Sequence, residues 1–229
     1  MRRLFFVLLA LASATAVSAG QLPNRQAFDL KVCGDSNYPP PTALGWSAKD
    51  REAPKCEPAS ARNYTPKHKG IGFEILNLES EACFVPDESY QTLDAIIDRV
   101  LARVANLQST LGDPESILAV SRATSDVLTD MGFALWVPTH SLSDALFTRR
   151  TSSDKFRHIF DCDNGSMILM TIADALGIKA DLVEITLPSG NQHNYVRWPI
   201  AGKPPVEWDM NIREQCITPR HAGLPCLSP

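Results

Sequence analysis

Apolar residues in the middle of the chain recur at helical spacing. Between residues 90 and 107 they fall three or four positions apart, which predicts an amphipathic helix that Gly112-Asp113-Pro114 brings to an end. Asp113 is suited to cap a second helix that starts at Pro114 and ends by Gly132. A short third helix is predicted over residues 141–147. Stripes of this kind form cores, so we assign no chemistry to these helices.

The pattern changes between residues 160 and 210. Residues 164–176 are apolar on almost every side, which predicts a buried helix, and Gly177 is well placed as its C-terminal cap. Strand-like segments follow at 180–187, 192–198 and 206–210. The residues Ile200-Ala201-Gly202 predict a three-residue hairpin loop between the last two strands. A buried helix followed by an antiparallel meander of three strands indicates an α+β fold.

The first 19 residues have the pattern of a secretory signal peptide. Arg2 and Arg3 precede an uncharged apolar run, and small residues lead up to a cleavage site after Ala19. The run is too short to span a membrane and no later segment is long enough, so we expect no membrane segment in the mature form. The mature protein is expected to be secreted or periplasmic, where disulfides form.

The net charge of the chain argues against nucleic acid as a partner. It carries 22 basic and 26 acidic residues, and loss of residues 1–19 moves the formal net charge from −4 to −6. A nucleic-acid-binding protein needs a basic surface, so nucleic acid is not an expected partner. Nothing in the sequence indicates an oligomeric state.

Four segments are predicted. After the signal peptide (1–19), residues 20–85 form a Pro-rich arm, which a bridge between Cys33 and Cys56 would staple. Residues 86–212 hold the helices and the sheet as one domain, and residues 213–229 form a tail in which Cys216 and Cys226 are most simply a disulfide. Six cysteines permit fifteen pairings, so the connectivity stays open.

Cys162 is a candidate catalytic residue. It lies in Asp161-Cys162-Asp163-Asn164-Gly165, where the buried helix begins, and a helix N-terminus favours the thiolate form. The flanking carboxylates oppose that effect, so a reactive Cys162 requires a positively charged partner. The alternative is a half-cystine or an inert buried thiol.

His193 and Asp209 can supply that partner. A hairpin centred on Ala201 puts His193 directly opposite Asp209, with Cβ atoms about 5 Å apart on the same face. This predicts a hydrogen bond that orients the imidazole and stabilises its protonated form. A bulge at Gly202 would shift the register, and Glu207 would then be the acid instead.

In these residues, their order and their elements, the chain resembles the transglutaminase-like superfamily, and within it the bacterial cysteine-peptidase branch. The resemblance covers residues 142–210. It implies a papain/transglutaminase-like fold with Cys162 as nucleophile, His193 as general base and acid, and Asp209 as the residue that orients the histidine. Many members have Gly where Phe160 stands, and this bulk is expected to narrow the access to Cys162.

Other parts of the site are less defined. The backbone N–H of Cys162 is one candidate oxyanion donor, and Trp136, Gln192 and Asn194 are candidates for a second. Cys162 and His158 are a poor zinc pair, because no second close Cys/His pair accompanies them. No loop has the spacing of calcium ligands or of a phosphate-binding motif, so no cofactor and no metal are expected.

These features predict a secreted or periplasmic thiol enzyme. It would act on amide or ester bonds of a protein or peptide substrate through a thioester, as a protease or amidase or as an acyltransferase. One alternative is a catalytically inactive transglutaminase-like module for binding or assembly in the cell envelope. Another is a disulfide-stapled structural protein in which Cys162 is bridged.

Overall fold

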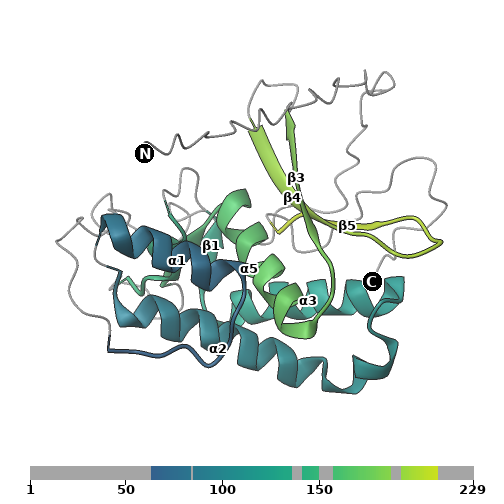
Figure 1. Cartoon of the computed structure of the whole chain (residues 1–229), viewed down its shortest axis with the longest axis horizontal. Helices are drawn as coiled ribbons and strands as arrows, with labels where there is room; N and C mark the ends of the chain where they lie inside the picture. Colours follow the sequence, from purple (N-terminus) through teal and green to yellow (C-terminus); the bar gives the residue numbers. More distant parts are fainter. Residues whose placement is uncertain (1–62, 84, 136–140, 150–156, 187–191, 211–229) are drawn as a thin grey trace, which may run out of the picture.

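A computed structural model of the chain describes residues 63–83, 85–135, 141–149, 157–186 and 192–210 (Figure 1). The predicted signal peptide, most of the predicted arm with Cys33 and Cys56, Trp136, and the predicted tail with Cys216 and Cys226 lie outside these residues. In chain order the elements are α1 (Ile71–Ala82), α2 (Asp87–Arg103), the 3₁₀ helix η3 (Ala105–Thr110), α3 (Pro114–Asp130), β1 (Phe133–Leu135), α4 (Leu142–Leu146), β2 (His158–Phe160), α5 (Cys162–Leu176), β3 (Asp181–Thr186), β4 (Gln192–Trp198) and β5 (Val206–Trp208).

The fold combines helices with two small sheets, so the α+β class expected from the sequence is confirmed in this general sense. Strands β3, β4 and β5 form the predicted antiparallel meander. Strands β1 and β2 form a separate parallel pair in which Phe133 lies beside His158. This second sheet was not predicted, because two strands of three residues are too short to show a period.

Helix α5 is the central element of the fold. It contacts α1 and α2 as well as β4, and in Figure 1 it lies between the helices and the three-stranded sheet. Ile168, Leu169 and Ile172 are fully buried, as the apolar sequence predicts. Gly177 ends the helix in the left-handed conformation, with φ 68°, which explains why glycine stands there.

Helix α1 lies within the segment assigned to the arm, residues 20–85, where no helix was predicted. Phe73 and Leu76 are buried, and the backbone N–H of Gly72 donates to Thr171 Oγ1 of α5 at 2.9 Å. A Cβ atom at Gly72 would come within 2.4 Å of the same oxygen, so glycine allows the two helices to approach. The pattern was missed because it is short and because Leu78, which fits no buried stripe, is 63% exposed.

Carboxylates of α2 hold the segment before α1, and the most buried of them is Asp94. Asp94 is 1% exposed and accepts hydrogen bonds from the Tyr64 hydroxyl at 2.6 Å and from the backbone N–H groups of Lys67 and His68 at 2.9 and 3.1 Å. The hydrogen bond to Asp94 raises the pKa of Tyr64 to about 12, which keeps the hydroxyl protonated as the donor. The end of the predicted arm is therefore joined to the domain by polar contacts.

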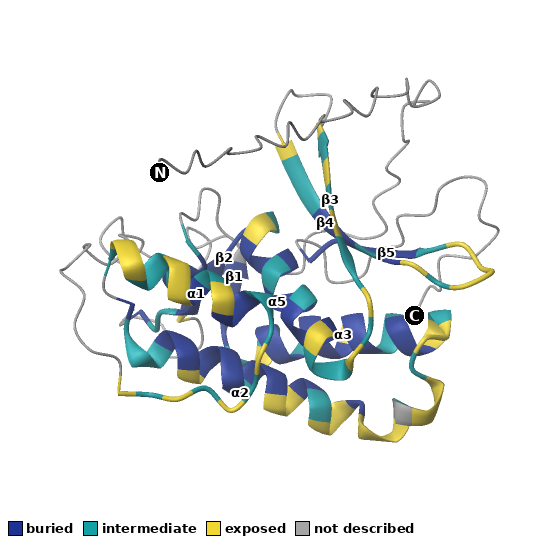
Figure 2. Cartoon of the chain, viewed as in Figure 1, coloured by how far each residue is buried: buried dark blue, intermediate teal, exposed yellow. Residues whose placement is uncertain are grey.

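Exposed and buried residues separate as the helical periods predict. Figure 2 shows exposed residues on the outer face of α2 and buried ones on the face toward the other helices. In the part of the chain that the structure describes, no helix is both long and apolar enough to cross a membrane.

Candidate active site

Cys162 is the first residue of α5, and the sequence around it fixes that position. Asp161 is the N-cap: its carboxylate accepts hydrogen bonds from the backbone N–H of Asp163 at 3.1 Å and of Asn164 at 3.2 Å. The Asn164 side chain accepts in return from the Asp161 N–H at 3.3 Å, which completes a capping box. Cys162 is a free, partly exposed cysteine, and its sulfur lies at the positive end of the helix dipole.

Phe160 is a core residue. Its ring is fully buried, and it packs edge-on against Phe133 with ring centroids 5.9 Å apart. A Cβ atom at Gly165 of α5 would come within 3.0 Å of the same ring. The side chain thus supports the first turn of α5 from inside the fold, whereas its bulk was expected to narrow the access to Cys162.

His193 and Asp209 form the predicted hydrogen bond, with 2.5 Å between Nε2 and Oδ2. Both groups are shielded from solvent, since their side chains are 15% and 5% exposed. The pKa of His193 is raised to about 10, first by its hydrogen bond with Asp209 and next by one with the side chain of Cys162, against the opposing effect of burial. The His193 side chain therefore interacts with both Asp209 and Cys162.

The strand register predicted for this pair was wrong by two residues. Val196 pairs with Trp208 and Trp198 with Val206, so the hairpin is centred on Gly202 and not on Ala201. Continued along the strands, this register puts Asp209 diagonal to His193 and not opposite it. A shift of two keeps both side chains on the same face, and diagonal neighbours are within reach of long side chains.

The loop between β4 and β5 explains the shift. A turn closes early, where the backbone N–H of Lys203 donates to the carbonyl of Ile200 at 3.2 Å. Pro204 and Pro205 follow, and proline has no N–H to give to a strand ladder. Pairing therefore begins only at Val206, and the loop is longer than the three residues expected.

Glu207, the alternative acid, has another role. It pairs across the strands with Arg197, whose guanidinium Nε donates to Glu207 Oε1 at 2.8 Å. The Tyr195 hydroxyl donates to the same oxygen at 3.3 Å. Glu207 thus holds Arg197, and Asp209 is the carboxylate beside His193.

A second link between α5 and β4 was not predicted. The Cys162 thiol donates to Asp163 Oδ1, with 3.5 Å between the atoms, and the Asn194 amide nitrogen donates to that same oxygen. The sequence marked Asp163 only as an opposing charge and Asn194 only as a candidate oxyanion donor. Of the other candidate donors, Gln192 accepts from Thr186 Oγ1 at 3.0 Å and Trp136 lies outside the described residues.

His158 belongs to the core. It is 5% exposed and stacks on Phe133 with ring centroids 4.5 Å apart. Burial lowers its pKa to about 4, so the ring is neutral at physiological pH. Within the described ranges, no group of three or more His, Cys, Asp or Glu residues is arranged to hold a metal ion.

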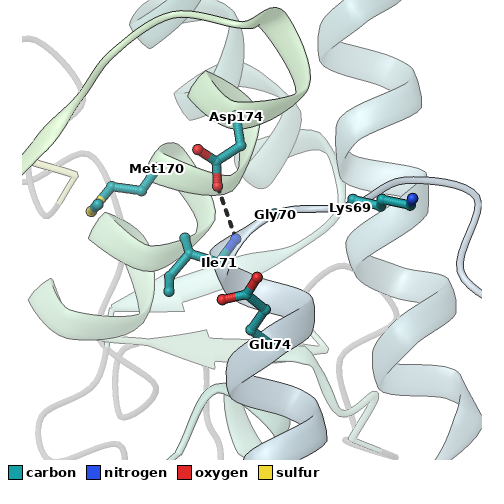
Figure 3. A pocket seen from close by; sticks show the side chains of 6 residues that line it. All are labelled: Lys69, Gly70, Ile71, Glu74, Met170 and Asp174. Atoms are coloured by element: carbon teal, nitrogen blue, oxygen red, sulfur yellow. Dashed lines mark hydrogen bonds between the residues drawn. The ribbon is translucent and has the colours of Figure 1, made fainter.

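A pocket of about 500 Å³ lies elsewhere, between the start of α1 and the later turns of α5 (Figure 3). Its lining residues are Lys69, Gly70, Ile71, Glu74, Met170 and Asp174. Asp174 accepts a hydrogen bond from the Ile71 N–H at 2.8 Å and so caps α1 in place of a local side chain. At 1.5 Å per helical residue, Asp174 lies about 18 Å along α5 from Cys162, so this pocket is separate from the thiol.

The arrangement around Cys162 suits nucleophilic chemistry. A thiol at a helix N-terminus stands beside an imidazole that a buried carboxylate orients, which is the order of groups that activates a cysteine. Neither a protein-family model, nor a curated protein, nor a solved structure matches the chain.

Proposed function

We propose that this protein is a thiol hydrolase or acyltransferase that cleaves amide or ester bonds of a protein or peptide. Cys162 is the nucleophile, His193 the general base and acid, and Asp209 the orienting carboxylate. The observation that carries the proposal is the position of His193, which bonds to Asp209 at 2.5 Å and also interacts with the Cys162 side chain.

The first half-reaction forms a thioester. The His193 imidazole takes the thiol proton, and the Cys162 sulfur attacks the carbonyl carbon of the substrate. The backbone N–H of Cys162 is a donor for the resulting oxyanion. When the bond from carbon to the leaving nitrogen or oxygen breaks, the imidazolium gives its proton to the leaving group.

The second half-reaction releases the acyl group. His193 removes a proton from water or from an amine, which attacks the thioester carbon. The carbon–sulfur bond breaks and Cys162 is restored as the thiol. Water makes the enzyme a hydrolase and an amine makes it a transferase, and both share the first half-reaction.

The raised pKa of His193 supports this assignment. With a pKa of about 10 the imidazole holds its proton at neutral pH. An imidazolium beside Cys162 provides the positive charge that the sequence requires, because the carboxylates of Asp161 and Asp163 flank the thiol. The pair can therefore exist as thiolate and imidazolium in spite of its acidic neighbours.

The order of elements supports a papain/transglutaminase-like fold. The cysteine begins a central helix, the histidine lies on the middle strand of the meander, and the aspartate follows the last strand directly. We place this domain in the periplasm or outside the cell on the basis of the signal-peptide pattern in residues 1–19.

One observation favours an inactive binding or assembly module as the second candidate. The Cys162 thiol donates a hydrogen bond to the Asp163 carboxylate, and this contact stabilises the neutral thiol. If the hydrogen bond to Asp163 stabilises the thiol more than His193 stabilises the thiolate, the sulfur stays protonated. The domain then binds a partner without catalysis.

Alkylation of Cys162 separates the two candidates. The purified, non-reduced protein is treated with iodoacetamide from pH 4 to 9 and read by peptide mass spectrometry, beside His193→Ala. His68→Ala is the matched control, because His68 also bonds to an aspartate, Asp98, but away from Cys162. We expect fast labelling well below pH 8 that is lost only in His193→Ala. Labelling only above pH 8 in all three proteins, or a bridged Cys162, overturns the enzyme proposal.

A further inference from the structure

Two neighbouring pairs of residues join α5 to β4 side by side. Cys162 meets His193, and the next residue of each element makes the second contact, because Asn194 donates its amide N–H to Asp163. The oxygen that accepts from Asn194, Oδ1, is also the one that accepts from the Cys162 thiol at 3.5 Å. The second pair therefore acts on the same sulfur as the first.

The two contacts on Asp163 Oδ1 have opposite consequences for the thiol. A thiol that donates to a carboxylate is stabilised in its neutral form, because ionisation would put two negative charges together. An amide N–H on that oxygen offsets part of its charge and competes for its lone pairs. The amide does not titrate between pH 4 and 9, so Asn194 exerts this effect throughout that range.

We propose that Asn194 is a positioning residue that acts on Cys162 through Asp163. It fixes the Asp163 carboxylate against β4, weakens its hold on the thiol proton and so lets that proton pass to His193. This inference rests on the proposed function, since it concerns the same thiol and the same histidine.

The environment of Asn194 fits this role. Its amide oxygen is buried and has no hydrogen-bond partner, so the side chain makes its polar contact through the amide N–H, to Asp163. Two apolar side chains could hold α5 against β4 without the free energy needed to desolvate an amide and a carboxylate. An amide at this place instead gives a donor to a charged oxygen next to the sulfur.

The other charged groups around the thiol are held independently of Asn194. Asp161 is 5% exposed and accepts from the backbone N–H groups of the first helical turn. Asp209 is bonded to His193. Glu184 is the residue of β3 that lies directly opposite Asn194, and it is exposed to solvent, where its charge is screened. A substitution of Asn194 thus changes Asp163 first.

The test is the pH profile of iodoacetamide alkylation at Cys162 in the purified, non-reduced protein. Wild type is compared with Asn194→Ala, Asp163→Asn and the double variant. We expect Asn194→Ala to move the midpoint upward by roughly half to one pH unit, and Asp163→Asn to move it downward. The double variant should match Asp163→Asn, because without the carboxylate Asn194 has nothing to act through.

Asn77→Ala is the matched control, because Asn77 is an amide on α1 that accepts a hydrogen bond from the Tyr90 hydroxyl and does not contact Asp163. It should leave the midpoint unchanged. Asn194→Ser, whose hydroxyl is too short to reach Asp163, repeats the measurement if Asn194→Ala does not fold. The melting temperature of each variant, read beside the profile, reports any purely structural loss.

The outcomes separate this inference from the proposed function. If Asn194 has only a structural role, Asn194→Ala lowers the reactivity or the melting temperature but leaves the midpoint of the pH profile unchanged. That result overturns the positioning role of Asn194. The enzyme proposal still stands in that case if the wild-type midpoint is low. An equal upward shift from Asn194→Ala in the Asp163→Asn background also overturns it. A wild-type protein that reacts only above pH 8 overturns the proposed function itself.

Discussion

His193 and Asp209 are diagonal neighbours, not direct partners, across the hairpin of β4 and β5, and yet their side chains lie 2.5 Å apart. The register puts Asp209 opposite Tyr195, and Tyr195 and His193 share one face of β4, so the two side chains lie on the same face. Asp209 follows the last residue of β5, so its side chain is not confined to the strand ladder and can lean along the sheet. The pairing depends on side-chain reach as well as on register.

The identity of the acid can be tested with two matched substitutions. Asp209→Asn removes the charge that stabilises the imidazolium, so labelling of Cys162 by iodoacetamide at pH 6 should slow by about tenfold or more. Glu207→Gln removes an equally buried charge two residues earlier, but Glu207 holds Arg197 and should leave that rate unchanged. The assignment of Asp209 is wrong if Glu207→Gln slows the reaction and Asp209→Asn does not.

The raised pKa of His193 also predicts how stability depends on pH. The folded-state pKa of about 10 lies above the ordinary value of 6.5, so the His193–Asp209 pair stabilises the folded state fully below pH 6.5. This stabilisation is lost as the pH rises from 6.5 through 10. Urea unfolding should therefore show a large difference between wild type and Asp209→Asn at pH 6 and a small one at pH 10.

An exposed histidine–aspartate pair provides the control for that experiment. His68 and Asp98 lie 2.7 Å apart, but their side chains are 22% and 43% exposed. Exposed ion pairs contribute little to stability, so Asp98→Asn should change the unfolding free energy by less than about 1 kcal/mol at both pH values. Equal effects from Asp98→Asn and Asp209→Asn would contradict the role assigned to burial.

The elements that carry the candidate site could be predicted, because each has a strong local signal. The run of apolar residues before Gly177 marks α5, and alternation marks β4. The register could not be set, because it depends on a loop whose length Gly202 alone does not reveal and which Pro204 and Pro205 extend. The hydrogen bond was predicted correctly because an error of two residues preserves the face.

The approach of Cys162 to His193 could not be predicted from spacing. It depends on how α5 packs against β4, which is a tertiary contact between segments about thirty residues apart. The sequence contains its elements, such as the glycine at 165 that lets Phe160 and Met210 come close. The link from Asn194 to Asp163 was missed for the same reason, since the two residues are 31 positions apart and meet only through the packing of α5 on β4.

The N-cap of α5 should contribute to stability as well as to the position of the thiol. Asp161→Ala removes two hydrogen bonds to the first helical turn, so we expect a loss of about 1–2 kcal/mol in urea unfolding. Asp113 is the N-cap of α3 and makes no such bond, so Asp113→Ala should cost less. Equal losses would show that the capping box does not fix the start of α5.

Gly165 provides a test of the packing that brings the site together. A Cβ atom there would lie 2.7 Å from Met210 Cβ and 3.0 Å from the Phe160 ring, so Gly165→Ala should destabilise the protein by about 1–3 kcal/mol. Met210 directly follows Asp209, and its displacement should also slow iodoacetamide labelling of Cys162. Gly72→Ala is the control, because it crowds Thr171, on a later turn of α5 away from Cys162, at 2.4 Å. Both variants should unfold at lower urea concentrations, but only Gly165→Ala should change the labelling rate. An unchanged rate in Gly165→Ala would show that the position of Asp209 does not depend on this contact.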